Sequence, residues 1–233
     1  MSVILTANSN KRWPTKVPYT IAEDSGDVAK NSVKEINDAV GFELLIPKQS
    51  TDKAYLTIKA GTAGSSPIGY SGGELKVFAP AKMHDMVHEI LHALGFGHEQ
   101  YHKEYPWDDG QATWNYSKTD VFFKTQNTVS AYKQSNIGNN NTLFTKIKAA
   151  SGWDDELTTL QLVYRHSYLK NDDFESTTNC DADSVMMYPQ MSLAVKNANI
   201  NSDHYVKTEL VKEGKSLSKG DVVTLLNMYG HLK

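Results

Sequence analysis

The strongest constraint in the sequence is a short segment in which three histidines and one glutamate fall at fixed spacing. Beginning at His88, the chain reads HEILHALGFGH. Residues four apart share one face of a helix, so His88 and His92 can direct both imidazoles at a single ion. Gly95 can adopt the left-handed conformation that ends a helix without strain, and the chain can then return so that His98 supplies a third nitrogen. The pattern therefore predicts a helix that ends beside a metal site.

The donor set of this segment is typical of zinc. Three neutral imidazoles and one water form an open tetrahedral zinc site of the catalytic kind. Zinc lowers the pKa of such a water to about 7, which supplies a nucleophile at neutral pH. Glu89 lies beside that water and can take its proton as a general base. The alternative, a core helix with incidental histidines, is disfavoured because histidine and glutamate are poor core residues.

Hydrophobic periodicity indicates the elements around this segment. Apolar residues fall on one stripe of 3.6-residue period between Asp27 and Val40, and a second helix is expected from Met83 to Leu94. The mixed pattern of residues 74–78 is typical of an edge strand. Strands are expected over residues 16–22, 42–46, 55–59 and 74–78, with a glycine- and serine-rich loop over residues 61–73.

The second half of the chain differs, because strand signals nearly vanish there. A last helix is expected over residues 218–229, where Ser218 and Asp221 resemble a capping box. Strands and two helices come first and helices with irregular segments follow, which predicts an α+β fold with two lobes. Helices are expected over residues 120–132, 143–150 and 156–168, and the buried stripe of the last helix is expected to comprise Val222, Leu225, Leu226 and Tyr229.

Composition excludes several classes of protein. The 233 residues are 39% hydrophobic, enough for a core in one large domain or two small lobes. The net charge of -3 gives no indication of a nucleic-acid partner. No apolar run approaches the roughly 18 residues of a membrane helix, and the first residues do not form a signal peptide. The single cysteine, Cys180, cannot form a disulfide within the chain.

The full pattern H-E-x-x-H-x-x-G-x-x-H resembles the metzincin signature, whose members carry a methionine turn further along the chain. The segment SVMMY, which begins at Ser184 and contains Met186, fits that turn. Glu99, directly after the third histidine, narrows the resemblance to the astacin family of zinc metalloproteases. Further matches are Trp13-Pro14, Val17-Pro18-Tyr19, Gly72-Gly73, Leu217-Ser218, Asp221 and residues 226–229.

The resemblance implies a two-lobed metzincin fold in a single catalytic domain that spans residues 1–233. Residues 1–98 would form an upper lobe with a twisted mixed sheet, two long helices and the active-site segment. Residues 99–233 would form a mostly helical or irregular lower lobe with the methionine turn and the C-terminal helix. The interval before the turn is longer than is usual in the family, so a helical insertion is expected at about residues 110–172. It would restrict or select substrates; a structural elaboration is the alternative.

The resemblance also implies roles for individual residues. Met186 would form a hydrophobic floor beneath the three histidines. Tyr188 would be a zinc ligand in the free enzyme, and would leave the metal on substrate binding to donate a hydrogen bond to the oxyanion. Glu99 would hold the buried N-terminus of the mature chain through its charge. Core packing after a turn is the alternative for Met186 and Tyr188.

Some features depart from the family pattern or carry no motif. The two disulfides usual in the family are missing, as is the pro-segment, and Met187 stands where a histidine is usual. Missing disulfides favour a bacterial protein. Cys180 is expected to be a half-buried thiol, with an inhibitory zinc contact as the alternative. His84, His102, His166, His204 and His231 are expected to be solvated surface residues.

We interpret the chain as a zinc-dependent endopeptidase with one zinc ion, in which Glu89 is the base. A protein or peptide substrate would bind in an extended cleft and add antiparallel to residues 74–78. We expect a monomer that binds neither nucleic acid nor membrane and is secreted, with delivery into a host cell as one route. Two alternatives are a zinc hydrolase of other peptide-like amides and a peptide-binding relative without turnover. Intact Glu89 and Tyr188 argue against the second.

Overall fold

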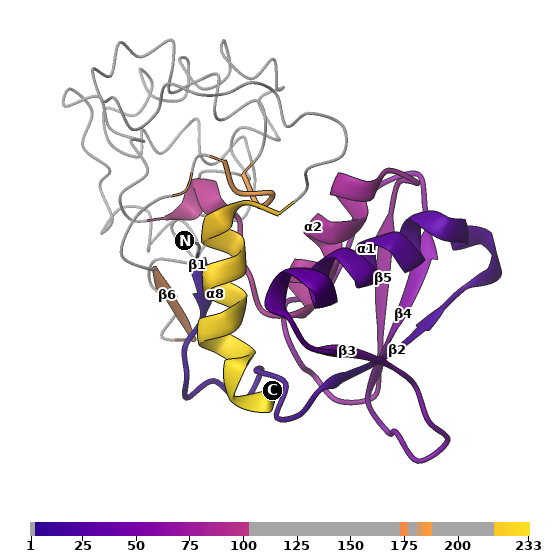
Figure 1. Cartoon of the computed structure of the whole chain (residues 1–233), viewed down its shortest axis with the longest axis horizontal. Helices are drawn as coiled ribbons and strands as arrows, with labels where there is room; N and C mark the ends of the chain where they lie inside the picture. The colour runs from indigo at the N-terminus through magenta and orange to yellow at the C-terminus, as the bar shows by residue number, and fades with distance from the viewer. Residues whose placement is uncertain (1–2, 103–172, 177–180, 182, 188–216) are drawn as a thin grey trace, which may run out of the picture.

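The computed structural model describes residues 3–102, 173–176, 181, 183–187 and 217–233 (Figure 1). These residues form a mixed α/β fold with one four-stranded sheet, two helices packed against it, a small two-stranded sheet and a C-terminal helix. The helices expected over residues 120–132, 143–150 and 156–168, and the insertion that contains them, lie outside the described residues.

The four-stranded sheet has the order β3-β2-β4-β5. All three neighbouring pairs are parallel. The expectation of a mixed sheet is therefore met, within the described residues, only by an antiparallel bridge between Ser65 and Phe78 at the outer edge. The strands are β2 (Val17–Ile21), β3 (Leu45–Pro47), β4 (Tyr55–Ala60) and β5 (Glu74–Ala79).

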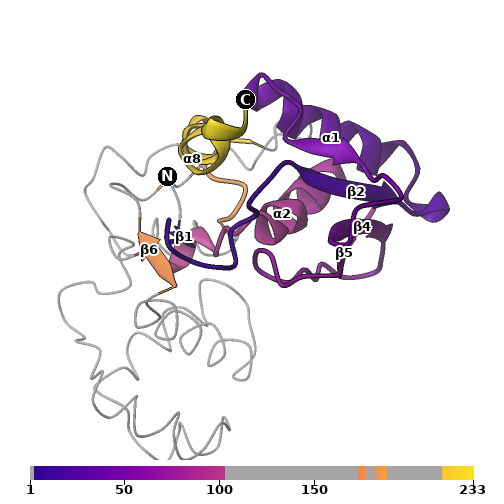
Figure 2. The same ribbon diagram turned by 90° about the horizontal axis from the view of Figure 1, so that it is seen from below.

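Among the described residues, helices cover one face of this sheet. Along β5, Leu75 and Val77 are buried whereas Glu74 and Lys76 are exposed, which is the alternation of a strand with one wet face. The covering layer consists of α1 (Gly26–Val40) and α2 (Met83–Ala93), which contact each other (Figure 2). Because β2 and β3 are parallel neighbours, the chain between them needs a crossover, and α1 provides it.

The periodicity of α1 predicted its packing correctly. Ala29, Val33, Ile36 and Val40 are all buried, and the helix ends at Gly41, which has a φ of 75°. The strand expected over residues 42–46 is shorter at its start, because residues 42–44 turn back after the helix and the pairing with Val17 begins only at Leu45.

Unlike α1, α2 is buried around its whole circumference from Met86 to Ala93. It lies between the sheet, α1 and the loops that follow it. Trp13, which is itself buried, donates a hydrogen bond from its Nε1 to the carbonyl oxygen of Ala93 over 2.9 Å. The core therefore surrounds the helix that carries His88 and His92.

The C-terminal helix α8 (Lys219–Tyr229) begins with the capping box that the sequence indicates. Ser218 Oγ accepts from the Asp221 amide, and the Asp221 carboxylate accepts from the Ser218 amide. The predicted stripe is wrong in part, since the side chain of Leu226 is 40% exposed and Val222 is only half-buried. The buried face of α8 instead includes Asp221 of the capping box. Its residues are Asp221, Thr224, Leu225, Met228 and Tyr229.

Two short strands were not predicted. β1 (Val3–Leu5) and β6 (Phe174–Ser176) pair antiparallel, although they are far apart in the sequence (Figure 1). Three residues are too few for an alternation signal. The backbone of β1 also bonds to the segment after α2, with Leu5 N–H donating to Gly95 O over 3.0 Å and Gly97 N–H to Val3 O over 2.7 Å.

Among the described residues, no helix has both the length and the apolar character needed to cross a membrane.

The buried hydroxyl of Tyr229 is expected to stabilise the contact between α8 and the end of α2. It donates to the carbonyl oxygen of Leu94 over 2.6 Å. Tyr229→Phe leaves that buried acceptor without its donor, so we expect the free energy of unfolding to fall by about 1 to 3 kcal/mol. Denaturant titration measures this. Tyr55→Phe, at a half-buried position on β4, is the control and should change stability by less than about 0.5 kcal/mol. Equal effects of the two changes would contradict the assignment.

Candidate metal centre

The end of α2 determines how the three histidines meet. His88 and His92 lie one turn apart on the helix, and the chain leaves it through Gly95, which has a φ of 101°. A β-carbon at Gly95 would also lie only 2.9 Å from Leu5 Cδ1, so no other residue fits without strain. The helix end predicted at Gly95 is therefore observed, and it directs the chain back toward His98.

The three imidazoles converge on one point. One ring nitrogen from each of His88, His92 and His98 lies within 4.8 Å of the others. The Nε2 atoms of His92 and His98 are 3.1 Å apart. His88 and His92 are 8% and 6% exposed, so their rings are largely withdrawn from water. This donor set fits zinc, which has three protein ligands in its catalytic sites, and three histidines are one of the known sets.

Hydrogen bonds to the second ring nitrogen orient two of these rings. His88 Nδ1 lies 2.8 Å from the carbonyl oxygen of Val185, and His92 Nδ1 lies 2.7 Å from that of Phe96. Because a carbonyl oxygen can only accept, Nδ1 carries the proton in both rings and Nε2 keeps its lone pair. Such outer partners are the usual means of holding a metal-binding histidine in position.

Burial also keeps the histidines neutral. It lowers the pKa of His88 to about 4, and together with the neighbouring His88 it lowers the pKa of His92 to about 3. Burial, followed by the charges of His92 and His88, lowers the pKa of His98 well below its usual range. Neutral imidazole is the form that binds a metal ion, so the site is prepared for one at neutral pH.

Glu89 is the acidic group of the site. Its side chain is 8% exposed, and burial, together with the nearby Asp85, raises its pKa to about 7. A carboxyl group with a pKa near the working pH can both accept and return a proton. The loop of residues 61–73 passes directly beside this carboxylate, at Gly64.

The predicted methionine turn contacts the histidine segment, since His88 Nδ1 bonds to the carbonyl oxygen of Val185. Residues 184–187 are buried, and Met186 is completely so. The turn is tied to the segment after His98, because the Glu99 amide donates to the carbonyl oxygen of Met186 over 3.0 Å.

Asp221 is a residue of this region that the sequence analysis treated only as a helix cap. Its carboxylate is fully buried and accepts from Ser184 Oγ over 2.6 Å and from the Val185 amide over 3.0 Å. The carbonyl of Val185 in turn bonds to His88. A continuous chain of hydrogen bonds thus runs from the start of α8 to the first histidine. The capping box was the available signal, but it does not reveal the second pair of bonds.

Glu99 is completely buried, as its predicted contact with an N-terminus requires. One carboxylate oxygen accepts from the Asp181 amide over 2.6 Å, and the other has no hydrogen-bond partner among the described residues. Burial raises its pKa to about 8, whereas the bond from Asp181 acts in the opposite direction. The first two residues lie outside the described part of the chain, so the contact itself stays a prediction.

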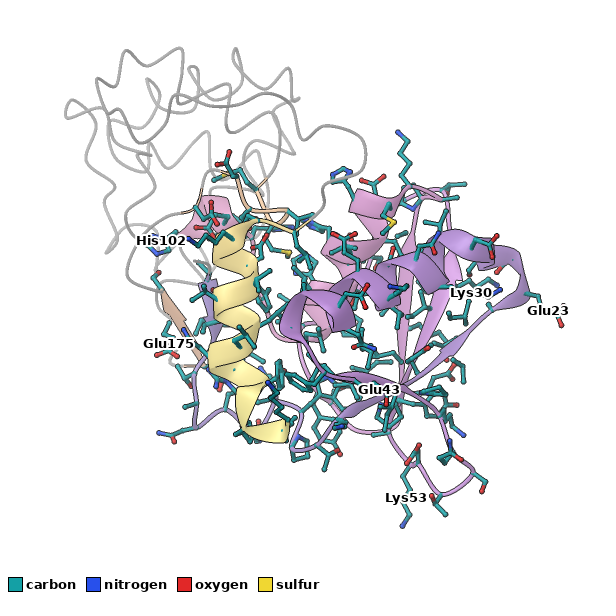
Figure 3. The ribbon with its side chains drawn as sticks, viewed as in Figure 1. Glu23, Lys30, Glu43, Lys53, His102 and Glu175 are labelled. Atoms are coloured by element: carbon teal, nitrogen blue, oxygen red, sulfur yellow. The ribbon has the colours of Figure 1, made fainter. Side chains whose placement is uncertain are left out.

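The other candidate residues divide into three groups. His84 is 40% exposed in its side chain and contacts Asp85, and His231 is also exposed, as predicted. His102 is completely buried, so its prediction as a surface residue is wrong. It directly follows the turn η2 (Glu99–Tyr101), where Figure 3 labels it, and Glu99 and Tyr101 of this turn are completely buried as well. Outside the described residues lie Tyr188, Cys180, His166 and His204.

Comparison with known proteins relates the chain to one family. The model of the astacin family of peptidases matches residues 5–106. Low choriolytic enzyme of Oryzias latipes is 29% identical over 132 residues, which cover 47% of this chain and 48% of that protein. Zinc metalloproteinase nas-4 of Caenorhabditis elegans is 30% identical over 98 residues, 39% of this chain and 31% of that protein. The chain thus spans about half or less of these curated relatives.

A solved structure extends the likeness of fold beyond the matched segment. High choriolytic enzyme 1, a hatching enzyme zinc-protease from Oryzias latipes, aligns with a TM-score of 0.50 at 15% identity, over 96% of each chain. At that identity the likeness concerns the fold alone. The resemblance to the astacin family that the sequence pattern predicted is therefore confirmed over residues 5–106, which carry the three histidines and Glu89.

Proposed function

We propose that this chain is a zinc-dependent endopeptidase with one zinc ion. The observation that carries the proposal is the convergence of three neutral imidazoles, two of them buried and that of His98 half-buried, at the helix that also carries the buried carboxyl group of Glu89, whose pKa is about 7. His88, His92 and His98 would hold the ion. Zinc supplies at such a site a Lewis acid that polarises a carbonyl and lowers the pKa of a water molecule.

The residues of the chain would then move one proton twice. Glu89 accepts the proton of the attacking water as its oxygen adds to the carbonyl carbon of the substrate. The bond from this carbon to the amide nitrogen then breaks, and Glu89 returns the proton to the leaving nitrogen, so the products are a carboxyl group and an amine. The carbonyl groups of Val185 and Phe96 keep two imidazoles in their orientation throughout.

Two residues of the methionine turn complete this proposal. Met186, buried against the histidine segment, serves as the apolar floor of the site. Tyr188 follows the described turn directly and is assigned the role of a zinc ligand in the free enzyme. With substrate bound, its phenol donates to the oxyanion.

The substrate is proposed to be a protein or peptide bound in an extended conformation. β5 is an edge strand, as predicted, but its outer edge is already hydrogen-bonded to another segment of the chain at Phe78. The amide and carbonyl groups of Phe78 bond to Ser65, each over 2.9 Å. The expectation that a peptide adds along the whole of residues 74–78 is therefore wrong at Phe78. Since Gly64 lies beside Glu89, we assign the pairing edge to the Ser65 segment instead.

The wider organisation is part of the same proposal. We infer a single catalytic domain over residues 1–233, with an upper lobe to residue 98, a lower lobe from residue 99 and a helical insertion at about residues 110–172. We also propose secretion, by likeness to the choriolytic enzymes, and a monomeric state. Digestion of a peptide library, read by mass spectrometry, tests the activity. Cleavage of internal peptide bonds supports an endopeptidase, whereas cleavage of modified amides alone, or of nothing, contradicts it.

Loss of one imidazole should release the metal. In His92→Ala only two histidines and the proposed Tyr188 ligand remain, so the set of three histidines is broken and we expect the zinc content of the purified protein to fall well below one equivalent. His84→Ala, about two turns earlier on α2 and partly exposed, is the matched control and should keep its zinc. Elemental analysis checks both. Stoichiometric zinc in His92→Ala would contradict the assignment of the site.

The proton-transfer role of Glu89 gives a second expectation. Glu89→Gln keeps the shape of the side chain but removes the base, so kcat should fall by roughly 100- to 10,000-fold. Zinc content and melting temperature should stay close to those of the parent chain. Glu43→Gln, an exposed position, is the control for the loss of one negative charge. An unchanged kcat in Glu89→Gln would mean that another group activates the water.

The role of Tyr188 separates this proposal from a site of zinc, water and Glu89 alone. Tyr188→Phe removes one oxyanion donor, so kcat and kcat/KM should fall together by about 100- to 1,000-fold with KM little changed. A cobalt-substituted sample should show an altered spectrum, because the free enzyme loses one ligand. Tyr55→Phe again serves as the control. Full activity with an unaltered spectrum would make Tyr188 a packing residue.

A further inference from the structure

The loop of residues 61–73 makes an unusually close approach to Glu89. A β-carbon placed on Gly64 would lie 3.1 Å from Cδ and 3.4 Å from Cγ of Glu89, and less than 3.0 Å from its Oε1. Gly64 does not have a positive φ, so its backbone conformation is open to any residue. The reason for a glycine here is therefore space for the carboxylate, and not backbone strain.

The backbone of this loop is held on both sides of Gly64. Gly61 N–H donates to the carbonyl oxygen of Ala79 over 2.8 Å. Ser65, the next residue, exchanges two hydrogen bonds of 2.9 Å with Phe78. Further on, Gly69 N–H donates over 2.9 Å to the carbonyl oxygen of His92, which fixes the loop to α2 itself. A side chain at position 64 would consequently displace the carboxylate of Glu89 more easily than the loop.

We propose that Gly64 is a positioning residue for the general base. Because Gly64 has no side chain, the Glu89 carboxylate can occupy the space that a β-carbon would take. The backbone of Gly64 borders this space and limits where the carboxylate can lie. The contact itself follows from the geometry of the two residues, whereas its effect on turnover rests on the proposed peptidase function. Displacement of a catalytic group by about 1 Å can lower a rate by about 100-fold.

Kinetics of Gly64→Ala test the effect on turnover. We expect kcat to fall by about 10- to 100-fold, with KM and zinc content close to those of the parent chain. The matched control is Gly61→Ala in the same loop. Its β-carbon would meet its neighbours at 3.4 Å or more, and its φ is not positive, so its kcat should not change. A parental kcat in folded Gly64→Ala, or an equal loss in both variants, would overturn the proposal.

A double-mutant cycle, read by the melting temperatures of the purified variants, tests the contact without an activity measurement. Gly64→Ala should lower the melting temperature by about 2 to 4 °C when Glu89 is present, the shift expected for a loss of about 1 kcal/mol. It should cause no loss in the Glu89→Ala background, where the added methyl group enters the space left by the glutamate. The same loss in both backgrounds would overturn the proposal.

The cycle remains decisive if Gly64→Ala alone does not fold. A folded double variant with Glu89→Ala would then support the contact, and a double variant that also fails to fold would overturn it. If the parent chain hydrolyses no peptide, the proposed function fails, but the double-mutant cycle still decides whether Gly64 makes room for Glu89.

Discussion

Complete burial of α2 is the constraint on which the rest of the structure depends. A helix with an exposed face can direct its polar side chains to water, but α2 has no such face from Met86 to Ala93. Burial of a polar group in apolar surroundings without a hydrogen-bond partner costs roughly 2 to 7 kcal/mol of free energy. His88, Glu89 and His92 therefore require neighbouring segments to approach them. The methionine turn, the segment after Gly95 and the loop of residues 61–73 provide those approaches.

These neighbours are themselves held in place by the rest of the chain. Val185, whose carbonyl oxygen bonds to His88, donates a hydrogen bond from its amide to the carboxylate of Asp221 at the start of α8. A helix that contributes none of the three histidines thus still determines the orientation of one of them.

Local sequence patterns predicted the elements well where a single period governs them. The stripe of α1, the alternation of β5, the capping box and the helix end at Gly95 all follow from rules within one turn or one strand. What failed depends on contacts between distant segments. The β1 and β6 pair joins residues over a long separation, and each strand has three residues. Leu226 is exposed and His102 is buried because tertiary packing, and not side-chain polarity, decides which face turns inward.

The candidate site shows the same division. The spacing of the three histidines is local, and it was sufficient to predict that they meet. The role of Asp221 was hidden, because a capping residue uses its carboxylate locally and no pattern reports its additional bonds to Ser184 and Val185. Those bonds exist only once the methionine turn lies against α8.

The glycine- and serine-rich loop is the clearest case in which composition misleads. Such a loop suggests flexibility, yet this one is bonded to β5 through Ser65 and to α2 through Gly69. Its small residues allow close approach: Gly64 lies against Glu89, and a β-carbon at Gly69 would lie 2.5 Å from the carbonyl oxygen of Lys11. One loop, held by hydrogen bonds, therefore borders both the edge of the sheet and Glu89. In the proposed function, an extended peptide that pairs with the Ser65 segment would be placed relative to Glu89 by the same backbone that borders the carboxylate.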